Sequence, residues 1–281
     1  MTGFRTRLTE IAPGIRRLVA PNPSMMTGPG TNSYLVGERE VAVIDPGPAM
    51  DRHIRNLVDS APGPIRWILA THTHPDHSPA VSPLAAQTGA EVLGRPAPSG
   101  PHQDQTFRPE RVMNDGDRLE TEEFVIEALH TPGHASNHLC FHHRAAGMLF
   151  TGDHVINGST VVINPPDGDM AAYLASLARL QALGFKALAP GHGEVIDQPD
   201  QAFGGLIEHR LKRESRVNAA LIANPGVTSL DLVPPVYPEI PEQIHALAER
   251  SLLAHLLKLE NDGQARSDGT HWWPTSGSDR P

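Results

Sequence analysis

The spacing of apolar and polar positions divides the chain into two parts with different predicted secondary structure. In the first part, short apolar runs alternate with Gly- and Pro-rich turns and with stretches of helical period, a pattern typical of an α/β domain. From Pro199 onward, apolar residues recur mainly at helical spacing, and we expect long helices over residues 201–223 and 242–260. The sequence therefore predicts an α/β domain over residues 1–198 and a helical domain over residues 199–281.

Within the α/β part, each element is bounded by turn residues. We expect helices over residues 51–60, 79–88 and 169–183. The proline-rich stretch 95–109 is expected to be a surface loop, and a polar tail is expected from Asp262 onward. The apolar runs that we expect to be strands are residues 15–19, 32–36, 41–45, 65–70, 91–93, 124–130, 139–142, 148–151 and 187–189.

Composition narrows the class of protein. With 39% hydrophobic and 20% charged residues, the chain has the composition of a soluble globular protein. Its formal net charge of -9 argues against a general polyanion binder, which needs clustered Lys and Arg. Cys140 is the single cysteine, which excludes an intramolecular disulfide and a cysteine-based zinc finger. Residues 1–7 lead into no apolar signal core and no stretch is long enough to span a bilayer, so we expect a reducing, cytoplasmic setting.

Several strands of the first part end at a residue that can bind a metal, next to Gly or Pro. The densest case is the stretch 71–77, which follows an apolar run. Because side chains alternate along a strand, His72 and His74 project the same way and can share one ion. Asp76 and His77 lie in the following turn and can reach another. Chance histidines in a solvated loop are the alternative, but four potential ligands in six positions favour a metal site.

The candidate ligands are too many for one ion. Seven donors exceed the four that one zinc ion requires, but they suffice for two ions if one carboxylate bridges them. Asp153 suits the bridging position because it stands alone on its loop. The remaining donors divide into a set for one ion, His72, His74 and His134, and a set for the other, Asp76, His77 and His192.

The ordered motifs resemble those of the metallo-β-lactamase superfamily over roughly residues 10–197. This resemblance implies an αββα sandwich with a dinuclear metal site at the edges of its sheets, and it agrees with the division of ligands above. Two divalent ions, most often zinc, are expected. The motifs that carry the resemblance are His72-x-His74-x-Asp76-His77, Thr131-Pro132-Gly133-His134, Thr151-Gly152-Asp153 and Pro190-Gly191-His192-Gly193.

The same resemblance suggests roles for two residues outside the ligand set. Asp45, at the end of a strand, is expected to orient a ligand histidine. His138, four residues after His134, occupies a position where the resembled group often has histidine. We expect it to face the substrate or to support a ligand, with a packed strand histidine as the alternative.

The C-terminal part narrows the resemblance. The chain also resembles the β-lactamase-like group that includes a mitochondrial single-strand endoribonuclease. The residues that carry this finer resemblance are 32–37, Arg210, Leu253, Leu256, Leu257 and the run 258–260. That group carries a winged-helix-like appendage, so we expect a winged-helix-like fold over residues 199–281. The long helices of this part also offer a surface for a homodimer.

The expected chemistry is metal-dependent hydrolysis. Two cations about 3.5–4 Å apart can share a hydroxide, so no Ser or Cys nucleophile is needed. Asp76 and Asp153 are the candidate catalytic residues, with Asp153 as the proton acceptor. A small ester, thioester or lactone substrate suits the loop with Met25 and Met26 and the acidic charge. Single-stranded RNA is the second candidate, although residues 201–260 contain six Lys and Arg against seven Asp and Glu.

Other interpretations of the site are disfavoured by its ligand set. The β-lactamases that resemble this fold lack a bridging Asp, whereas this chain has Asp153. Persulfide dioxygenases of this fold bind one iron through two histidines and the Asp, fewer ligands than are present here. The diiron flavoproteins of this fold bind flavin in a separate domain, which the C-terminal part does not resemble. A non-catalytic metal-binding scaffold also stays open, and we expect no membrane partner.

Overall fold

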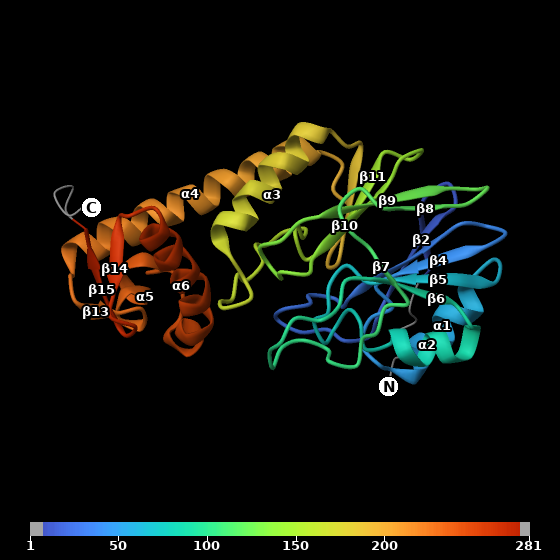
Figure 1. The fold of residues 1–281 in the computed structure, drawn as a ribbon, viewed down its shortest axis with the longest axis horizontal. Helices are drawn as coiled ribbons and strands as arrows, with labels where there is room; N and C mark the ends of the chain where they lie inside the picture. Colours follow the sequence, from blue (N-terminus) through green and yellow to red (C-terminus); the bar gives the residue numbers. More distant parts are fainter. Residues whose placement is uncertain (1–7, 276–281) are drawn as a thin grey trace. The chain divides into compact units, whose positions relative to one another are not determined.

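The computed structural model describes residues 8–275, which fall into two compact units (Figure 1). The first unit comprises the chain up to residue 131 together with residues 137–161 and 183–202. The second unit comprises residues 132–136, 162–182 and the chain from residue 203 onward. The N-terminal segment considered for a signal peptide lies outside the described residues, and the domain boundary at residue 198 stays a prediction.

The first unit contains a seven-stranded sheet in which the strands follow their order in the sequence. The first four strands are antiparallel, and β4 to β7 run parallel to one another. Parallel neighbours need crossover connections, and the helices α1 (Asp51–Ser60) and α2 (Val81–Thr88) supply two of them. The strands are β1 (Thr9–Ala12), β2 (Ile15–Val19), β3 (Asn32–Val36), β4 (Val41–Ile44), β5 (Ile65–Leu69), β6 (Glu91–Gly94) and β7 (Arg111–Val112).

A five-stranded sheet completes the first unit. Its order is β12-β11-β10-β9-β8, with β12 parallel to β11 and the other pairs antiparallel. The parallel pair brings the ends of two strands that are distant in sequence to the same edge. The strands are β8 (Arg118–Glu120), β9 (Val125–His130), β10 (Leu139–His143), β11 (Met148–Gly152) and β12 (Ala187–Pro190).

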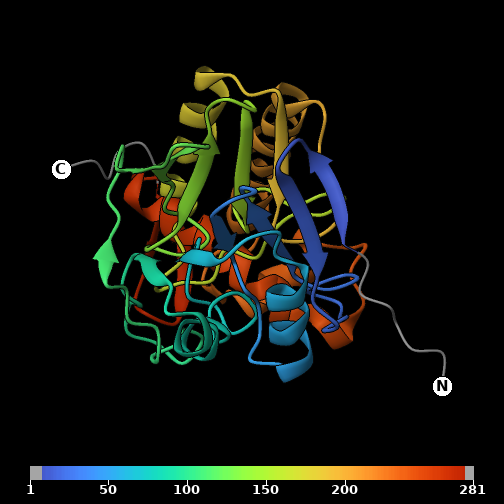
Figure 2. The ribbon, with the colours of Figure 1, turned by 90° about the vertical axis from the view of Figure 1, so that its right-hand side faces the viewer.

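Alternating side chains of the seven-stranded sheet build two separate cores. Ile44 and Leu69 face the five-stranded sheet, where they join a cluster with Phe141 and Phe150. Their neighbours point to the opposite face of the sheet, where Val43 and Ile68 pack in the cluster that receives Leu57 of α1 and Leu84 of α2. The two sheets therefore stack face to face, with α1 and α2 on the outer face of the larger one (Figure 2).

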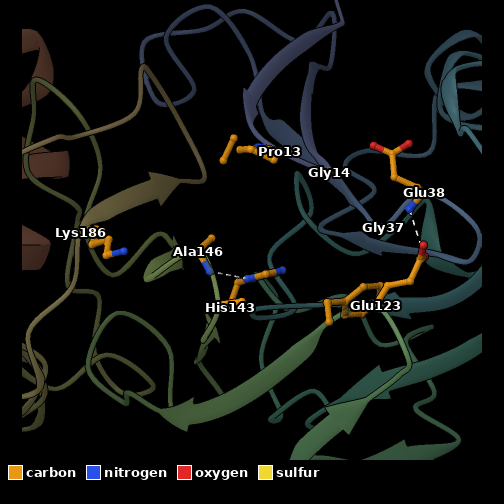
Figure 3. Close-up of a pocket in the computed structure, with 11 residues that line it drawn as sticks. Pro13, Gly14, Gly37, Glu38, Glu123, His143, Ala146 and Lys186 are labelled. Carbon is orange, nitrogen blue, oxygen red and sulfur yellow. Dashed lines mark hydrogen bonds between the residues drawn. The ribbon is translucent and has the colours of Figure 1, made fainter.

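One end of the sheet sandwich is closed by contacts between turns. The carboxylate of Glu123, before β9, accepts the backbone N–H groups of Glu38, Arg39 and Glu40 in the β3–β4 turn, at 2.9–3.2 Å. A groove of about 740 Å³ lies beside these turns and also reaches His143 (Figure 3). The strand-end ligands lie at the other ends of the strands.

The second unit has a small core of its own. Leu221, Leu232, Leu256 and Trp272 are buried in one cluster. A three-stranded sheet in the order β13-β15-β14 completes this cluster. The elements of this part are α3 (Met170–Leu183), α4 (Pro199–Ala223), β13 (Val227–Thr228), α5 (Val233–Val236), α6 (His245–Asn261), β14 (Ala265–Ser267) and β15 (His271–Pro274).

The polar tail expected from Asp262 onward is wrong. Residues 265–267 and 271–274 pair as an antiparallel hairpin, β14 and β15. Trp272 is only 5% exposed and Trp273 packs under the guanidinium of Arg266, 4.7 Å from its ring centre. Two short strands with one buried residue each leave too weak an alternation for the pattern to indicate a sheet.

Candidate metal centre

Parallel strands bring most of the candidate ligands to one edge of the first unit. His72, His74, Asp76 and His77 follow β5, and Asp45 follows its parallel neighbour β4. In the other sheet Asp153 follows β11, and His192 follows β12, which runs parallel to β11. Loops that leave the carboxyl ends of parallel strands converge, whereas the strands beneath them stay rigid.

Four of these side chains converge on one point. The ligand atoms of Asp76, His77, Asp153 and His192 all lie within 4.8 Å of one another. His192 Nε2 is 3.2 Å from Asp76 Oδ2 and 3.3 Å from Asp153 Oδ1. His77 Nε2 is 3.3 Å from the same Asp153 oxygen and 3.5 Å from Asp76 Oδ2. Two imidazoles and two carboxylates form a donor set of the kind that binds zinc.

A second pair of ring nitrogens lies in the same turn. His72 Nε2 and His74 Nδ1 are 3.0 Å apart, and the two rings meet edge to face with centres 4.5 Å apart. Two imidazole nitrogens this close need a proton or another cation between them, because both carry lone pairs. The alternation of side chains after β5 therefore brings these two histidines together, as expected.

His134 belongs to the second unit. It follows Thr131-Pro132-Gly133, and its Nδ1 donates to the carbonyl oxygen of Val162 at 2.8 Å. The carbonyl can only accept, so this contact places the ring proton of His134 on Nδ1 and the lone pair on Nε2. Its place as the third ligand beside His72 and His74 stays a prediction.

Asp45 orients two of the histidines at once. Its Oδ2 accepts the Nδ1–H of His77 at 2.9 Å and the hydroxyl of Thr71 at 2.7 Å. The Thr71 oxygen in turn accepts the Nδ1–H of His72 at 3.0 Å. Asp45 is 2% exposed and has a φ of 50°, a left-handed conformation that Asp adopts more readily than most residues. Both histidines therefore present Nε2, the usual result of such a supporting carboxylate.

The loop before β3 orients His192. The Nδ1–H of His192 donates to the carbonyl oxygen of Gly30 at 3.2 Å, and the backbone N–H of Asn32 donates to Gly191 at 2.8 Å. Gly30 has a φ of 140°, and a Cβ there would lie 2.0 Å from the carbonyl oxygen of Ala20, so only glycine fits. The buried side chains and fixed tautomers at this edge fit a divalent metal ion.

The carboxylates make this edge favourable for cations. Burial alone would lower the pKa of His77, but Asp76, Asp153 and Asp45 raise it well above its ordinary value. Burial would also lower the pKa of His192, but the carboxylates of Asp153 and Asp76 have the larger effect and raise it to about 10. Burial would raise the pKa of Asp153, but His192 and His77 hold it well below the usual range. The charges that stabilise these imidazolium forms would equally stabilise a bound metal cation.

His138 is buried against a candidate ligand histidine. It is 0% exposed, its Nδ1 lies 2.9 Å from the Thr131 hydroxyl, and its ring stacks on that of His72 with centres 5.0 Å apart. The neighbouring His154 is also fully buried, and its ring centre is 5.7 Å from that of His138. These contacts are those of a side chain that supports His72. Its functional role stays a prediction.

Sequence reasoning missed the groups that fix the tautomers. Thr71 precedes the first ligand histidine, and a hydroxyl in that position is a signal that could have been used. The carbonyl oxygens of Gly30 and Val162 carry no such signal, because every residue has a carbonyl and only the fold selects which ones face a histidine.

Comparison with known proteins supports this picture. The chain matches the Metallo-beta-lactamase superfamily over residues 26–192 and the Beta-lactamase associated winged helix domain over residues 228–273. The beta-lactamase-like protein 2 homolog of Drosophila melanogaster is 29% identical over 273 residues, which is 92% of each chain. The atrochrysone carboxyl ACP thioesterase of Aspergillus chevalieri is 32% identical over 265 residues, 90% of this chain and 83% of that protein. A beta-lactamase domain protein of Burkholderia ambifaria has a TM-score of 0.82 at 20% identity, covering 98% of this chain and 95% of that chain.

The fold, the His and Asp cluster at the sheet edge and the relatives together define the protein as a hydrolase whose cluster is suited to metal ions. The chain belongs to the metallo-beta-lactamase superfamily and carries the winged helix domain associated with it. The αββα sandwich and the C-terminal winged-helix-like domain expected from the sequence are thereby confirmed. Among the helices that the structure describes, none is both long and apolar enough to cross a membrane.

Proposed function

We propose that the protein hydrolyses ester-type bonds, thioesters first among them, with two bound divalent metal ions. His72, His74 and His134 would hold one ion, Asp76, His77 and His192 the other, and Asp153 would bridge them. The observation that carries this proposal is the convergence of Asp76, His77, Asp153 and His192 within 4.8 Å. We assign zinc to both positions because zinc is usually bound by four ligands, and histidine nitrogens and carboxylate oxygens are among the ligands it prefers.

The residues of the chain orient the reacting groups and hold protons. When bound, the metal ions supply Lewis acidity and activate water at neutral pH. We assign Asp153, whose Oδ1 lies 3.3 Å from both His77 Nε2 and His192 Nε2, as the group that would accept the proton released during attack. Asp76 is more open, with 27% of its side chain exposed against 13% for Asp153, so it is the carboxylate that a substrate meets from solvent.

A loop with two exposed methionines is evidence for a substrate with an acyl chain. Met25 and Met26 are 77% and 52% exposed, on the loop whose Gly30 carbonyl binds His192. The loop is held by its own hydrogen bonds, since Ser24 Oγ accepts the N–H groups of Met26 and Thr27 at 3.1 and 3.0 Å. An ordered loop with two exposed thioethers offers an adaptable apolar surface. The thioesterase activity in the name of the Aspergillus chevalieri relative points to the same bond.

Three cations of the C-terminal unit are paired with carboxylates, which favours a small substrate over RNA. Lys212 pairs with Glu208 at 2.5 Å, Arg213 with Glu239 at 2.9 Å, and Lys258 with Glu214 at 2.9 Å. Phosphate binding needs cations that are free to replace counterions, and these have acidic neighbours. Single-stranded RNA therefore enters the test as the competing substrate.

The decisive experiment combines turnover with metal analysis. Purified protein should contain two divalent ions per chain and hydrolyse acyl thioesters, and chelation should abolish turnover until metal is restored. Metal-dependent cleavage of single-stranded RNA with no thioester or lactone turnover would replace the ester-type assignment. About one iron and no zinc per chain would overturn the dinuclear hydrolase itself.

Two variants test the bridge. Asp153→Ala should abolish turnover and reduce the occupancy of both ions, because both depend on the shared carboxylate. His74→Ala should also abolish turnover but leave the ion held by Asp76, His77 and His192 in place. Metal analysis of the two variants side by side checks this, and two fully occupied ions in Asp153→Ala would refute the bridge.

A further inference from the structure

The proline-rich loop 95–109 is fastened to the turn that carries the histidine cluster. Thr73, in the middle of the cluster, is fully buried. Its hydroxyl donates to Gln103 Oε1 at 2.5 Å and accepts the side-chain N–H of Asn137 at 2.9 Å. Gln103 and Asn137 are themselves 8% and 5% exposed. Because the hydroxyl both donates and accepts, side chains from two separate segments fix its orientation.

Asp104 holds the same turn at two points. Its backbone N–H donates to the carbonyl oxygen of Thr73 at 2.6 Å. Its Oδ2 accepts the hydroxyl of Ser78, which directly follows His77, at 2.7 Å. Its other oxygen, Oδ1, accepts the N–H of Thr106 at 2.9 Å and so keeps the carboxylate in place. Asp104 therefore contacts the turn inside the cluster and again immediately after it.

The loop is rigid enough to act as a support. Phe107 is 2% exposed and packs in the core beneath the seven-stranded sheet. Asn137 also donates to the carbonyl oxygen of Pro96 at 3.2 Å, which ties the start of the loop to the same network. The loop is thus held near its start at Pro96 and near its end at Phe107, so Gln103 and Asp104 lie on an anchored segment.

We propose that Gln103 and Asp104 are positioning residues of the metal centre. They hold Thr73 and Ser78, and through them they set the spacing of the ligands at 72, 74, 76 and 77. This inference rests on the proposed metal-dependent function and deepens it. Groups that orient metal ligands typically change metal affinity by about 10- to 100-fold when removed.

The test measures cobalt(II) bound to the full-length protein. Affinity is obtained by competition with a chelator, and the visible spectrum of the loaded protein reports ligand geometry. Gln103→Ala and Asp104→Ala should each weaken binding by about 10-fold and alter the spectrum. Gln105→Ala is the matched control, since Gln105 is exposed on the same loop and bonds only within it, to Pro98 at 2.8 Å among its described contacts. It should match the wild type.

Conservative variants separate positioning from folding. Asp104→Asn keeps an oxygen for Ser78 and should retain near-wild-type affinity. Thr73→Val removes the hydroxyl that donates to Gln103. The losses of metal affinity in Thr73→Val and Gln103→Ala should therefore be less than additive in the double variant. If the alanine variants fail to fold by circular dichroism, Thr73→Val decides the question through the same affinity and spectrum.

The outcomes distinguish the two proposals. Wild-type protein that binds two cobalt(II) ions, with Gln103→Ala and Asp104→Ala that bind them equally well and with the same spectrum, would overturn the positioning role alone. Wild-type protein that binds no cobalt(II) or zinc would overturn the proposed function and this inference with it.

Discussion

At the scale of single residues, the ligand edge depends on glycines as much as on histidines. A Cβ at Gly191 would lie 2.7 Å from both Asp153 Oδ1 and His77 Cε1. A Cβ at Gly152, which has a φ of 46°, would lie 2.5 Å from the Thr71 hydroxyl. The backbone at Gly152, the last residue of β11, and at Gly191, directly after β12, therefore approaches the candidate ligands more closely than any larger residue permits.

Gly191→Ala tests this close approach. The new methyl group must displace Asp153 or His77, so we expect metal content to fall below two ions per chain and turnover to fall by about 100-fold, the typical cost of a 1 Å misplacement. Gly205→Ala is the control, because a Cβ there would meet no atom within 4 Å. Metal analysis and thioester kinetics check both variants, and a fully loaded, fully active Gly191→Ala would contradict the argument.

At the scale of elements, strands that are buried over their whole length were predicted from the sequence within a residue or two. β3, β4 and β11 are of this kind. β7 and β14, with two and three residues, are too short to show a period and were not predicted. The candidate ligands could be picked out of the sequence because Gly and Pro mark where each buried run ends. Their carbonyl partners could not, because only the folded chain selects them.

The helix α1 carries a histidine that should make stability depend on pH. His53 is fully buried, its Nε2 lies 2.9 Å from the hydroxyl of Ser33 on β3, and burial lowers its pKa to about 4. Below its ordinary pKa of about 6.5 the unfolded chain takes up a proton that the folded chain refuses. The contribution of His53 is therefore complete above pH 6.5 and is lost as the pH falls to 4, by up to about 3 kcal/mol.

Urea unfolding between pH 7.5 and 4.5 checks this expectation. His53→Gln cannot take up the proton, so its free energy of unfolding should fall less steeply with decreasing pH than that of the wild type. His102→Gln, a change at an exposed histidine, should keep the wild-type slope. Equal slopes for wild type and His53→Gln would show that this histidine does not contribute.

At the scale of the whole molecule, each unit has its own buried core, and metal ions bound at the candidate centre would add a further source of stability. A ligand that binds only the folded state stabilises it by about 4 kcal/mol when its concentration is 1,000 times its Kd. Three of the seven candidate ligands, His134, Asp153 and His192, lie far along the chain from the four at positions 72–77, so the unfolded chain does not assemble the full set. Metal should therefore act on the stability of the fold as well as on the reaction.

Metal removal tests this at the level of the intact chain. Chelation should lower the thermal unfolding midpoint by about 10 °C, because 1 kcal/mol corresponds to about 2–4 °C for a protein of this size. Calorimetry before and after chelation, and again after zinc is restored, measures the shift. An unchanged midpoint would argue that the ions bind weakly or not at all.

The contacts of Asp45 would make the two proposed ion sites dependent on each other. One carboxylate holds His77 directly and His72 through Thr71, and these two histidines serve different ions in the proposed division. An ion that fixes His72 also fixes Thr71 and Asp45, and Asp45 in turn fixes His77. The second ion would then bind to a site that is already partly ordered, with a smaller loss of conformational entropy. Loading should then be cooperative, with a coupling free energy shared equally by both ions. Half-loaded protein would be a minor species at every metal concentration.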